Sequence, residues 1–151
     1  MIGRSYMAEM YYRDFTSPAQ SADLVRAGID PESADMKYEV KCFMNGNKVR
    51  TVTARPFLYD EGCAPAKLES ADIPSWSLGR LLQLLPKPIR MDDTTFAYPV
   101  LRPFSHALSF EVGMAEHKQF MGDTDVEAAV KAMLWVLGDD RNKNHLNYER
   151  R

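Results

Sequence analysis

Few residues of this 151-residue chain are of types and spacings that suit catalysis or metal binding. The histidines are His106, His117 and His145, and no two of them are three or four residues apart, the spacing at which ligands share a helix face. There is no Cys-x-x-Cys motif. A zinc site would have to combine distant residues such as Cys42, Cys63 and His117, and we expect two small buried thiols instead. The sequence therefore predicts no metal site and no other cofactor.

The neighbouring residues Ser105 and His106 raise the question of nucleophilic catalysis. On a strand, adjacent side chains point to opposite faces, so these two cannot pair as nucleophile and base. His106 would share its face with Leu108 and Phe110, which favours a histidine satisfied within the sheet. The chain also has no Gly-x-Ser-x-Gly elbow and no glycine-rich phosphate loop.

Carboxylates form two doublets, Asp92-Asp93 and Asp139-Asp140, and occur singly at Glu111 and Glu116. General acid–base catalysis uses such groups, but aspartates are also common in turns and at helix ends. We therefore name no catalytic residue. The alternative hypothesis is a small hydrolase or nucleotide-modifying enzyme, with a site built from dispersed acids, arginines and His117.

The apolar residues of two expected helices are more informative than the candidate catalytic residues. Residues 71–89 carry a tryptophan and five leucines before two prolines, and Leu84 lies off the main apolar face of the expected helix. Trp135 likewise lies off the principal stripe of the last helix. Apolar residues beyond the core-facing stripe indicate a further contact surface. Our interface candidates are Trp76, Leu84 and Trp135, and the leading hypothesis is a non-enzymatic accessory protein that acts through protein–protein contacts, as a homodimer or with an unidentified partner.

Charge argues against a nucleic-acid-binding protein. The formal net charge is −2, and acids and bases are spread evenly, without the sustained basic excess that phosphate backbones attract. The C-terminal tail is modestly basic, and it supplies the candidates for a weak nucleic-acid contact: Arg141, Lys143, Arg150 and Arg151. We expect residues 139–151 to be a polar tail that frays into solvent.

Composition places the chain among soluble globular proteins, with 45% hydrophobic and 26% charged residues. No apolar run approaches the 18 or so residues that a membrane span requires, and the N-terminus lacks the apolar segment of a secretory signal. We expect a cytoplasmic protein with no membrane association, in a compartment where its cysteines stay reduced.

Three helices are predicted from caps and periodicity. Ser17, Pro18 and Gln20 form a capping box that starts a helix ending at Gly28. A second helix is expected over residues 75–85, beginning at Ser75 and ending at Pro86. The last runs from Thr124 to Gly138, with apolar residues at steps of three and four.

Alternating side chains predict the strands. Residues 36–44 and 48–54 flank an Asn-Gly-Asn turn and are expected to form a hairpin. Further strands are expected over 94–101, 105–113 and 115–121, and residues 60–72 are expected to be a surface loop. The sum is a single α+β domain, with a mostly antiparallel sheet of about five strands and two or three helices packed on one face.

Four segments resemble a family of small uncharacterised proteins encoded in prophages and mobile elements of gut bacteria. They are residues 16–21, 28–36, 73–86 and 127–137, of which the Trp-Ser-Leu helix with its following Leu-Leu-Pro is the most specific. The resemblance implies a phage-related intracellular protein. It carries no assigned activity, and so implies no catalytic residue.

Overall fold

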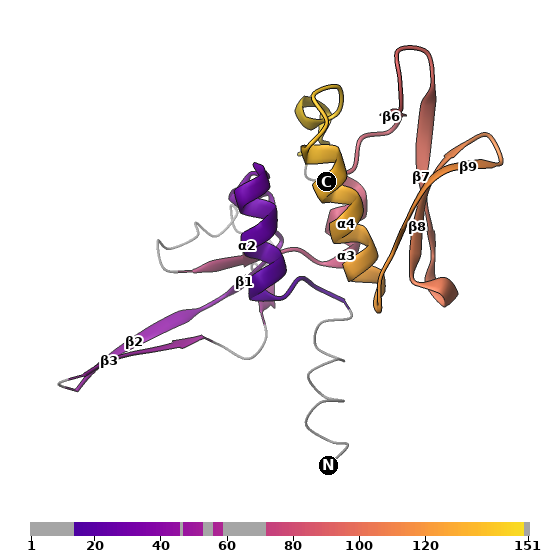
Figure 1. Cartoon of the computed structure of the whole chain (residues 1–151). Coiled ribbons are helices and arrows are strands. Elements are labelled where there is room, and N and C mark those ends of the chain that lie inside the picture. Colours follow the sequence, from indigo (N-terminus) through magenta and orange to yellow (C-terminus); the bar gives the residue numbers. More distant parts are fainter. Residues whose placement is uncertain (1–13, 46, 53–55, 59–71, 150–151) are drawn as a thin grey trace.

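The computed structural model describes residues 14–45, 47–52, 56–58 and 72–149 (Figure 1). It has the α+β fold predicted from the sequence, and every strand pairing is antiparallel. The strands in these ranges form three small sheets, ordered β4-β1-β5, β2-β3 and β6-β7-β8-β9. Within those ranges no helix has both the length and the hydropathy needed to cross a membrane.

The bounds of the described α-helices and strands are as follows. The helices are α2 (Pro18–Ala27), α3 (Leu78–Leu84) and α4 (Asp125–Leu137). The strands are β1 (Met36–Tyr38), β2 (Val40–Asn45), β3 (Asn47–Val52), β4 (Phe57–Leu58), β5 (Ile73–Ser75), β6 (Ile89–Arg90), β7 (Phe96–Arg102), β8 (Ala107–Val112) and β9 (Ala115–Met121).

Helix α2 starts and ends as its sequence predicts. The Ser17 hydroxyl accepts from the Gln20 amide at 3.2 Å, and the Gln20 side chain accepts from the Ser17 amide at 2.9 Å. Gly28 ends the helix with φ of +111°, a left-handed conformation that costs glycine little.

The helix predicted over residues 75–85 is shorter in the structure, where α3 begins at Leu78 and ends at Leu84. Ser75 is the last residue of β5, and Ser77 is the N-cap, whose hydroxyl accepts from the Arg80 amide. Asp35 fixes Ser77 in this role, because its carboxylate accepts from both the amide and the hydroxyl of Ser77. A tertiary contact thus selects one of two serines that are equally good caps by sequence.

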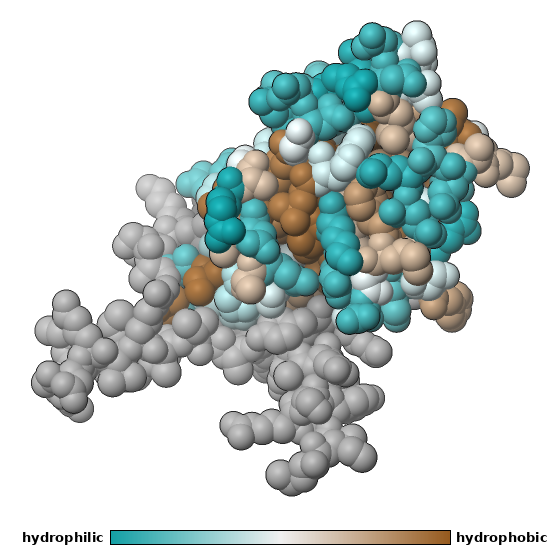
Figure 2. Space-filling model, viewed as in Figure 1, coloured by the Kyte–Doolittle hydropathy of each residue, from teal (hydrophilic) through white to brown (hydrophobic). Residues whose placement is uncertain are grey.

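Helix α4 lies at the centre of the packing. One side of it contacts β8 and β9, and it also packs against α2 and α3 (Figure 1). Its N-cap Thr124 accepts from the Glu127 amide at 3.1 Å, as predicted. On the face of the molecule shown in Figure 2, hydrophobic side chains gather between α2 and α4 with hydrophilic residues around them. Part of the apolar interior is therefore visible along this seam.

Each predicted strand has a counterpart among the described residues, most of them with shifted bounds, whereas β4, β5 and β6 were not predicted. The hairpin β2–β3 pairs Val40 with Val52 and Asn45 with Asn47 across the predicted turn. The expected strand 36–44 is divided, because β1 pairs with β4 and β5 while β2 pairs with β3. Strands β7, β8 and β9 form a meander, as predicted, which turns at Gly113 with φ of +62°. Nearly all of the expected loop 60–72 lies outside the described residues.

The C-terminal segment contradicts the expectation of a frayed tail. Leu146 is buried in the hydrophobic core, and the Asn147 amide donates to the Leu84 carbonyl at 2.9 Å. The Arg80 guanidinium donates to the carbonyls of Tyr148 and Glu149. Residues 146–149 are thus held against α3 by one apolar side chain, one backbone hydrogen bond and the hydrogen bonds from the Arg80 side chain. Residues 150–151 lie outside the described part.

Alanine substitutions at two glycines are expected to change the stability of the protein in opposite directions. A Cβ at Gly122 would lie 2.7 Å from the Glu127 Cβ and 3.0 Å from the Ala128 nitrogen of α4. Gly122→Ala should therefore lower the free energy of unfolding by about 1–3 kcal/mol.

A Cβ at Gly79, exposed on α3, meets only the Ser77 Oγ at 4.0 Å, so Gly79→Ala should raise the free energy of unfolding by about 0.5–1 kcal/mol. Urea unfolding measures both, and a Gly122→Ala protein as stable as the parent would contradict the packing described.

Candidate functional site

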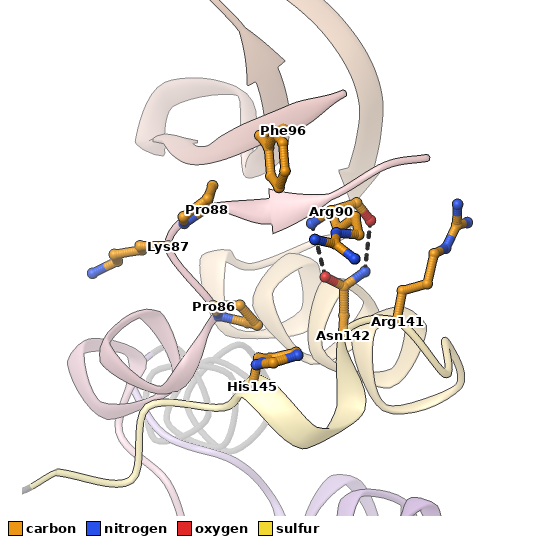
Figure 3. Close-up of a pocket in the computed structure, with 8 residues that line it drawn as sticks. All are labelled: Pro86, Lys87, Pro88, Arg90, Phe96, Arg141, Asn142 and His145. Carbon is orange, nitrogen blue, oxygen red and sulfur yellow. Dashed lines mark hydrogen bonds between the residues drawn. The ribbon is translucent and has the colours of Figure 1, made fainter. Parts of the chain in front are cut away.

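A polar pocket of about 310 Å³ lies where the chain leaves α3, enters β6 and meets the C-terminal segment. Figure 3 shows Phe96 and the Arg90 guanidinium on one side of it, with Pro86 and His145 on the other. The lining residues are Pro86, Lys87, Pro88, Arg90, Phe96, Arg141, Asn142 and His145.

Asn142 joins the two walls of the pocket. Its side-chain oxygen accepts from the Arg90 amide at 2.8 Å, and its side-chain nitrogen donates to the Arg90 carbonyl at 2.8 Å (Figure 3). The amide of Asn142 therefore occupies the free edge of β6 as a neighbouring strand would. Asn142 is itself 1% exposed, so these hydrogen bonds are shielded from water.

The pocket is positively charged. Among the eight described residues that line it, four are basic (Lys87, Arg90, Arg141 and His145) and none is acidic. Arg141 is partly neutralised by Asp139, at 3.4 Å. Within the described part of the chain, Lys87, Arg90 and His145 have no carboxylate within 4 Å. The charge of the lysine and the arginine is thus available to a ligand.

The Arg90 guanidinium is held over an aromatic ring. Its central carbon lies 5.4 Å from the centroid of Phe96, the residue that pairs with Arg90 across β6 and β7. Such a cation–π contact orients a guanidinium without using its N–H donors. The turn between the two strands is fixed by Asp92, and a hydrogen bond from the Thr94 backbone, with a further one from the Thr95 side chain, holds the pKa of that carboxyl below its ordinary value.

The basic tail residues predicted for nucleic-acid contact are divided between different environments. Arg141 lines the pocket. Lys143 pairs with Asp140 at 2.9 Å, and its hydrogen bond lowers the pKa of the Asp140 carboxyl. Arg150 and Arg151 lie outside the described residues.

Two of the three interface candidates belong to the core of this fold. Trp76 and Leu84 are both 0% exposed, and the Trp76 indole donates to the Ser33 hydroxyl at 3.0 Å. Trp135 is half-buried, tilted against Phe110 at 5.6 Å between centroids, with the Lys118 ammonium over its ring at 5.5 Å. The apolar surplus of the sequence is therefore largely absorbed by internal packing, since α4 has sheet on one side and helices on others.

His106 does not occupy the strand position expected for it. It precedes β8, has φ of +47°, and its Nδ1 lies 2.8 Å from the Asp125 Oδ1 at the start of α4. The left-handed residue follows the turn η2 (Pro103–Ser105), and the partner of its side chain is Asp125 of α4. Strand β8 begins at Ala107, two residues after the predicted start at residue 105.

The acids on the sheet are held by separate partners. Arg102 donates to Glu111 at 3.0 Å, and Ser109 donates to Glu116 at 3.2 Å. His117 is exposed on β9 and does not line the pocket. The described residues include no group of three or more potential metal ligands. Of the two cysteines, Cys63 lies outside the described residues, and nothing is described of the Cys42 side chain.

Sequence reasoning missed the residues that contribute most to the pocket, namely Lys87, Arg90 and Phe96. A signal was present, because two cations three residues apart flank Pro88 and Ile89 directly after the apolar helix. Nothing local indicated that residues 141–145 return to the same place. Comparisons with family models, with curated proteins and with solved structures give no match to this chain.

Proposed function

We propose that this protein is a binding protein for a ligand that carries a phosphate or a similar anionic group. The supporting observation is a pocket that collects four basic side chains and no acidic one in a chain whose net charge is −2. Acids and bases are evenly mixed along the sequence, so this local excess of positive charge is a product of folding.

The donors suit an oxyanion. A guanidinium presents several N–H groups in a plane, and it binds phosphate or carboxylate oxygens through paired hydrogen bonds. The Arg90 side chain is exposed, and its orientation over Phe96 leaves those N–H groups directed to solvent or ligand. Lys87 and Arg141 line opposite sides of the pocket, and both side chains extend outward in Figure 3. The volume of about 310 Å³ is at the lower end of the range for small-molecule sites.

Binding, without catalysis, is what the arrangement supports best. The alternative enzyme needs an acid or base beside the bound group, and the pocket lining offers only His145 for that role. The acids considered from the sequence, Glu111 and Glu116, have partners on the sheet.

A phosphate titration tests the proposal. Saturable chemical-shift changes in the amide spectrum should centre on residues 87–90 and 141–145, with millimolar affinity for inorganic phosphate and a higher affinity for pyrophosphate. Arg90→Gln should weaken binding by about tenfold or more, since a charged hydrogen bond contributes roughly 1.5–3 kcal/mol.

The matched control is Arg26→Gln. Arg26 is exposed on α2 and pairs with Asp23 at 3.2 Å, outside the residues that line the pocket. The Arg26→Gln substitution removes one positive charge, as Arg90→Gln does, and it should leave the affinity for phosphate unchanged. Equal weakening by both variants, or unsaturable shifts across the whole surface, would show only a nonspecific charge effect and would refute the site.

The protein-contact hypothesis stays a prediction. With Trp76 and Leu84 in the core, the exposed apolar residues that remain for it include Phe104 and Met121, which are 103% and 54% exposed. Light scattering at micromolar concentration would test for the homodimer.

A further inference from the structure

We propose that the anionic ligand is a nucleotide unit, with its phosphate in the basic pocket and its base stacked on the aromatic residues of β7. This inference rests on the proposed function, and it adds the chemistry of the uncharged part of the ligand. It is carried by the outer face of the four-stranded sheet, which adjoins the pocket.

The sheet β6-β7-β8-β9 has two unlike faces. Helix α4 covers the inner face, where Phe110 packs against Trp135 and Phe120. Along β7, burial alternates, with Ala97 buried between Phe96 and Tyr98, which are 43% and 56% exposed. Phe96 and Tyr98 therefore point to the outer face. Figure 1 shows no described helix on that side of β7 and β8.

This outer face begins at the pocket. Arg90 pairs with Phe96 across β6 and β7, so its side chain leaves the sheet on the same face. Phe96 lines the pocket and Tyr98 lies two residues further along the strand, about 7 Å away. A base joined to a phosphate in the pocket would therefore reach the Tyr98 ring within the length of one nucleotide.

The exposed aromatic rings of β7 are suited to bases, because every base presents a flat π-face and stacking needs no particular hydrogen-bond pattern. The acid nearest to Tyr98 on this face is its cross-strand partner Glu111. Glu111 is nearly buried and paired with Arg102, and Glu116 accepts a hydrogen bond from Ser109. The unpaired cations Lys87 and Arg90 thus remain at the end of the aromatic row nearest the phosphate.

Four probes separate the parts of this proposal: inorganic phosphate, ribose 5-phosphate, uridine 5′-monophosphate and a ten-residue oligouridylate. Affinities are measured by calorimetry or by amide shifts. The parent protein should bind uridine monophosphate about tenfold or more tightly than ribose 5-phosphate, because base–aromatic stacking adds affinity only when the base is present. Tyr98→Ala should abolish that difference, whereas Tyr98→Phe should retain it.

Phe104→Ala is the matched control, since Phe104 is an exposed aromatic residue beyond the far end of β7. It should leave every affinity unchanged. Tighter binding of the oligonucleotide than of the mononucleotide would identify a single strand as the source of the nucleotide, and equal binding would identify the free nucleotide. Equal affinities for uridine monophosphate and ribose 5-phosphate would overturn this inference and leave the phosphate site standing. Failure of all four probes to bind would refute the phosphate site and the nucleotide with it.

Discussion

Replacement of Trp76 by alanine is expected to lower the free energy of unfolding by about 3–5 kcal/mol. The side chain is 0% exposed and sits between α3 and the segment around Ser33, so its removal leaves a cavity that a close-packed core cannot fully close. The variant also leaves the Ser33 hydroxyl without its indole donor. Equilibrium unfolding in urea measures the change.

Two comparison variants separate the causes. Trp76→Phe keeps an aromatic ring but loses the 3.0 Å hydrogen bond to Ser33, and it should cost less than Trp76→Ala. Trp135→Ala removes a half-buried tryptophan and should also cost less. If Trp135→Ala proved as destabilising as Trp76→Ala, the assignment of Trp76 to the core and of Trp135 to its edge would be wrong.

Asn142→Ala is expected to cost about 2–4 kcal/mol and to abolish phosphate binding. It removes two hydrogen bonds of 2.8 Å from Asn142 to the backbone of Arg90, and it leaves that N–H and C=O without a protein partner. The C-terminal segment would lose its link to β6, so Arg141 and His145 would no longer be held opposite Arg90. Urea unfolding measures the loss of stability, and the phosphate titration measures the loss of binding.

Asn144→Ala is the control for this variant, because Asn144 is exposed in the short helix η3 (Lys143–His145). It should change the stability by less than about 0.5 kcal/mol and leave binding intact. Phosphate binding that survived Asn142→Ala would show that the C-terminal wall contributes nothing to the site.

The helix ends and hairpins of this protein are largely readable from the sequence. The capping box of Ser17 and Gln20, the cap Thr124 and the Asn-Gly-Asn turn act through hydrogen bonds or backbone preferences within a few residues. Features of this kind can be predicted from the sequence because the two interacting residues are only a few positions apart. The errors arose where two local solutions were equally good, as with Ser75 and Ser77, and a distant carboxylate, Asp35, decided between them.

The candidate site was not readable in the same way. The pocket lies between two segments, residues 86–96 and 141–145, that are some 50 residues apart in the sequence. The hydrogen bonds between Asn142 and Arg90 that join these segments produce no periodic pattern in the sequence. The same limit applies to burial, because hydropathy shows that Trp76, Leu84 and Trp135 are apolar but not which neighbour covers each one.

The sequence by itself determined the α+β class, the three α-helices and the strands of the β2–β3 hairpin and the β7-β8-β9 meander, because propensity, capping and alternation are local effects, but it did not predict β4, β5 or β6. The tertiary structure alone decided which apolar residues form the core, that the C-terminal segment is packed, and where positive charge collects. Those properties depend on contacts between distant segments, whose energies come from burial and from charges brought together only by the fold.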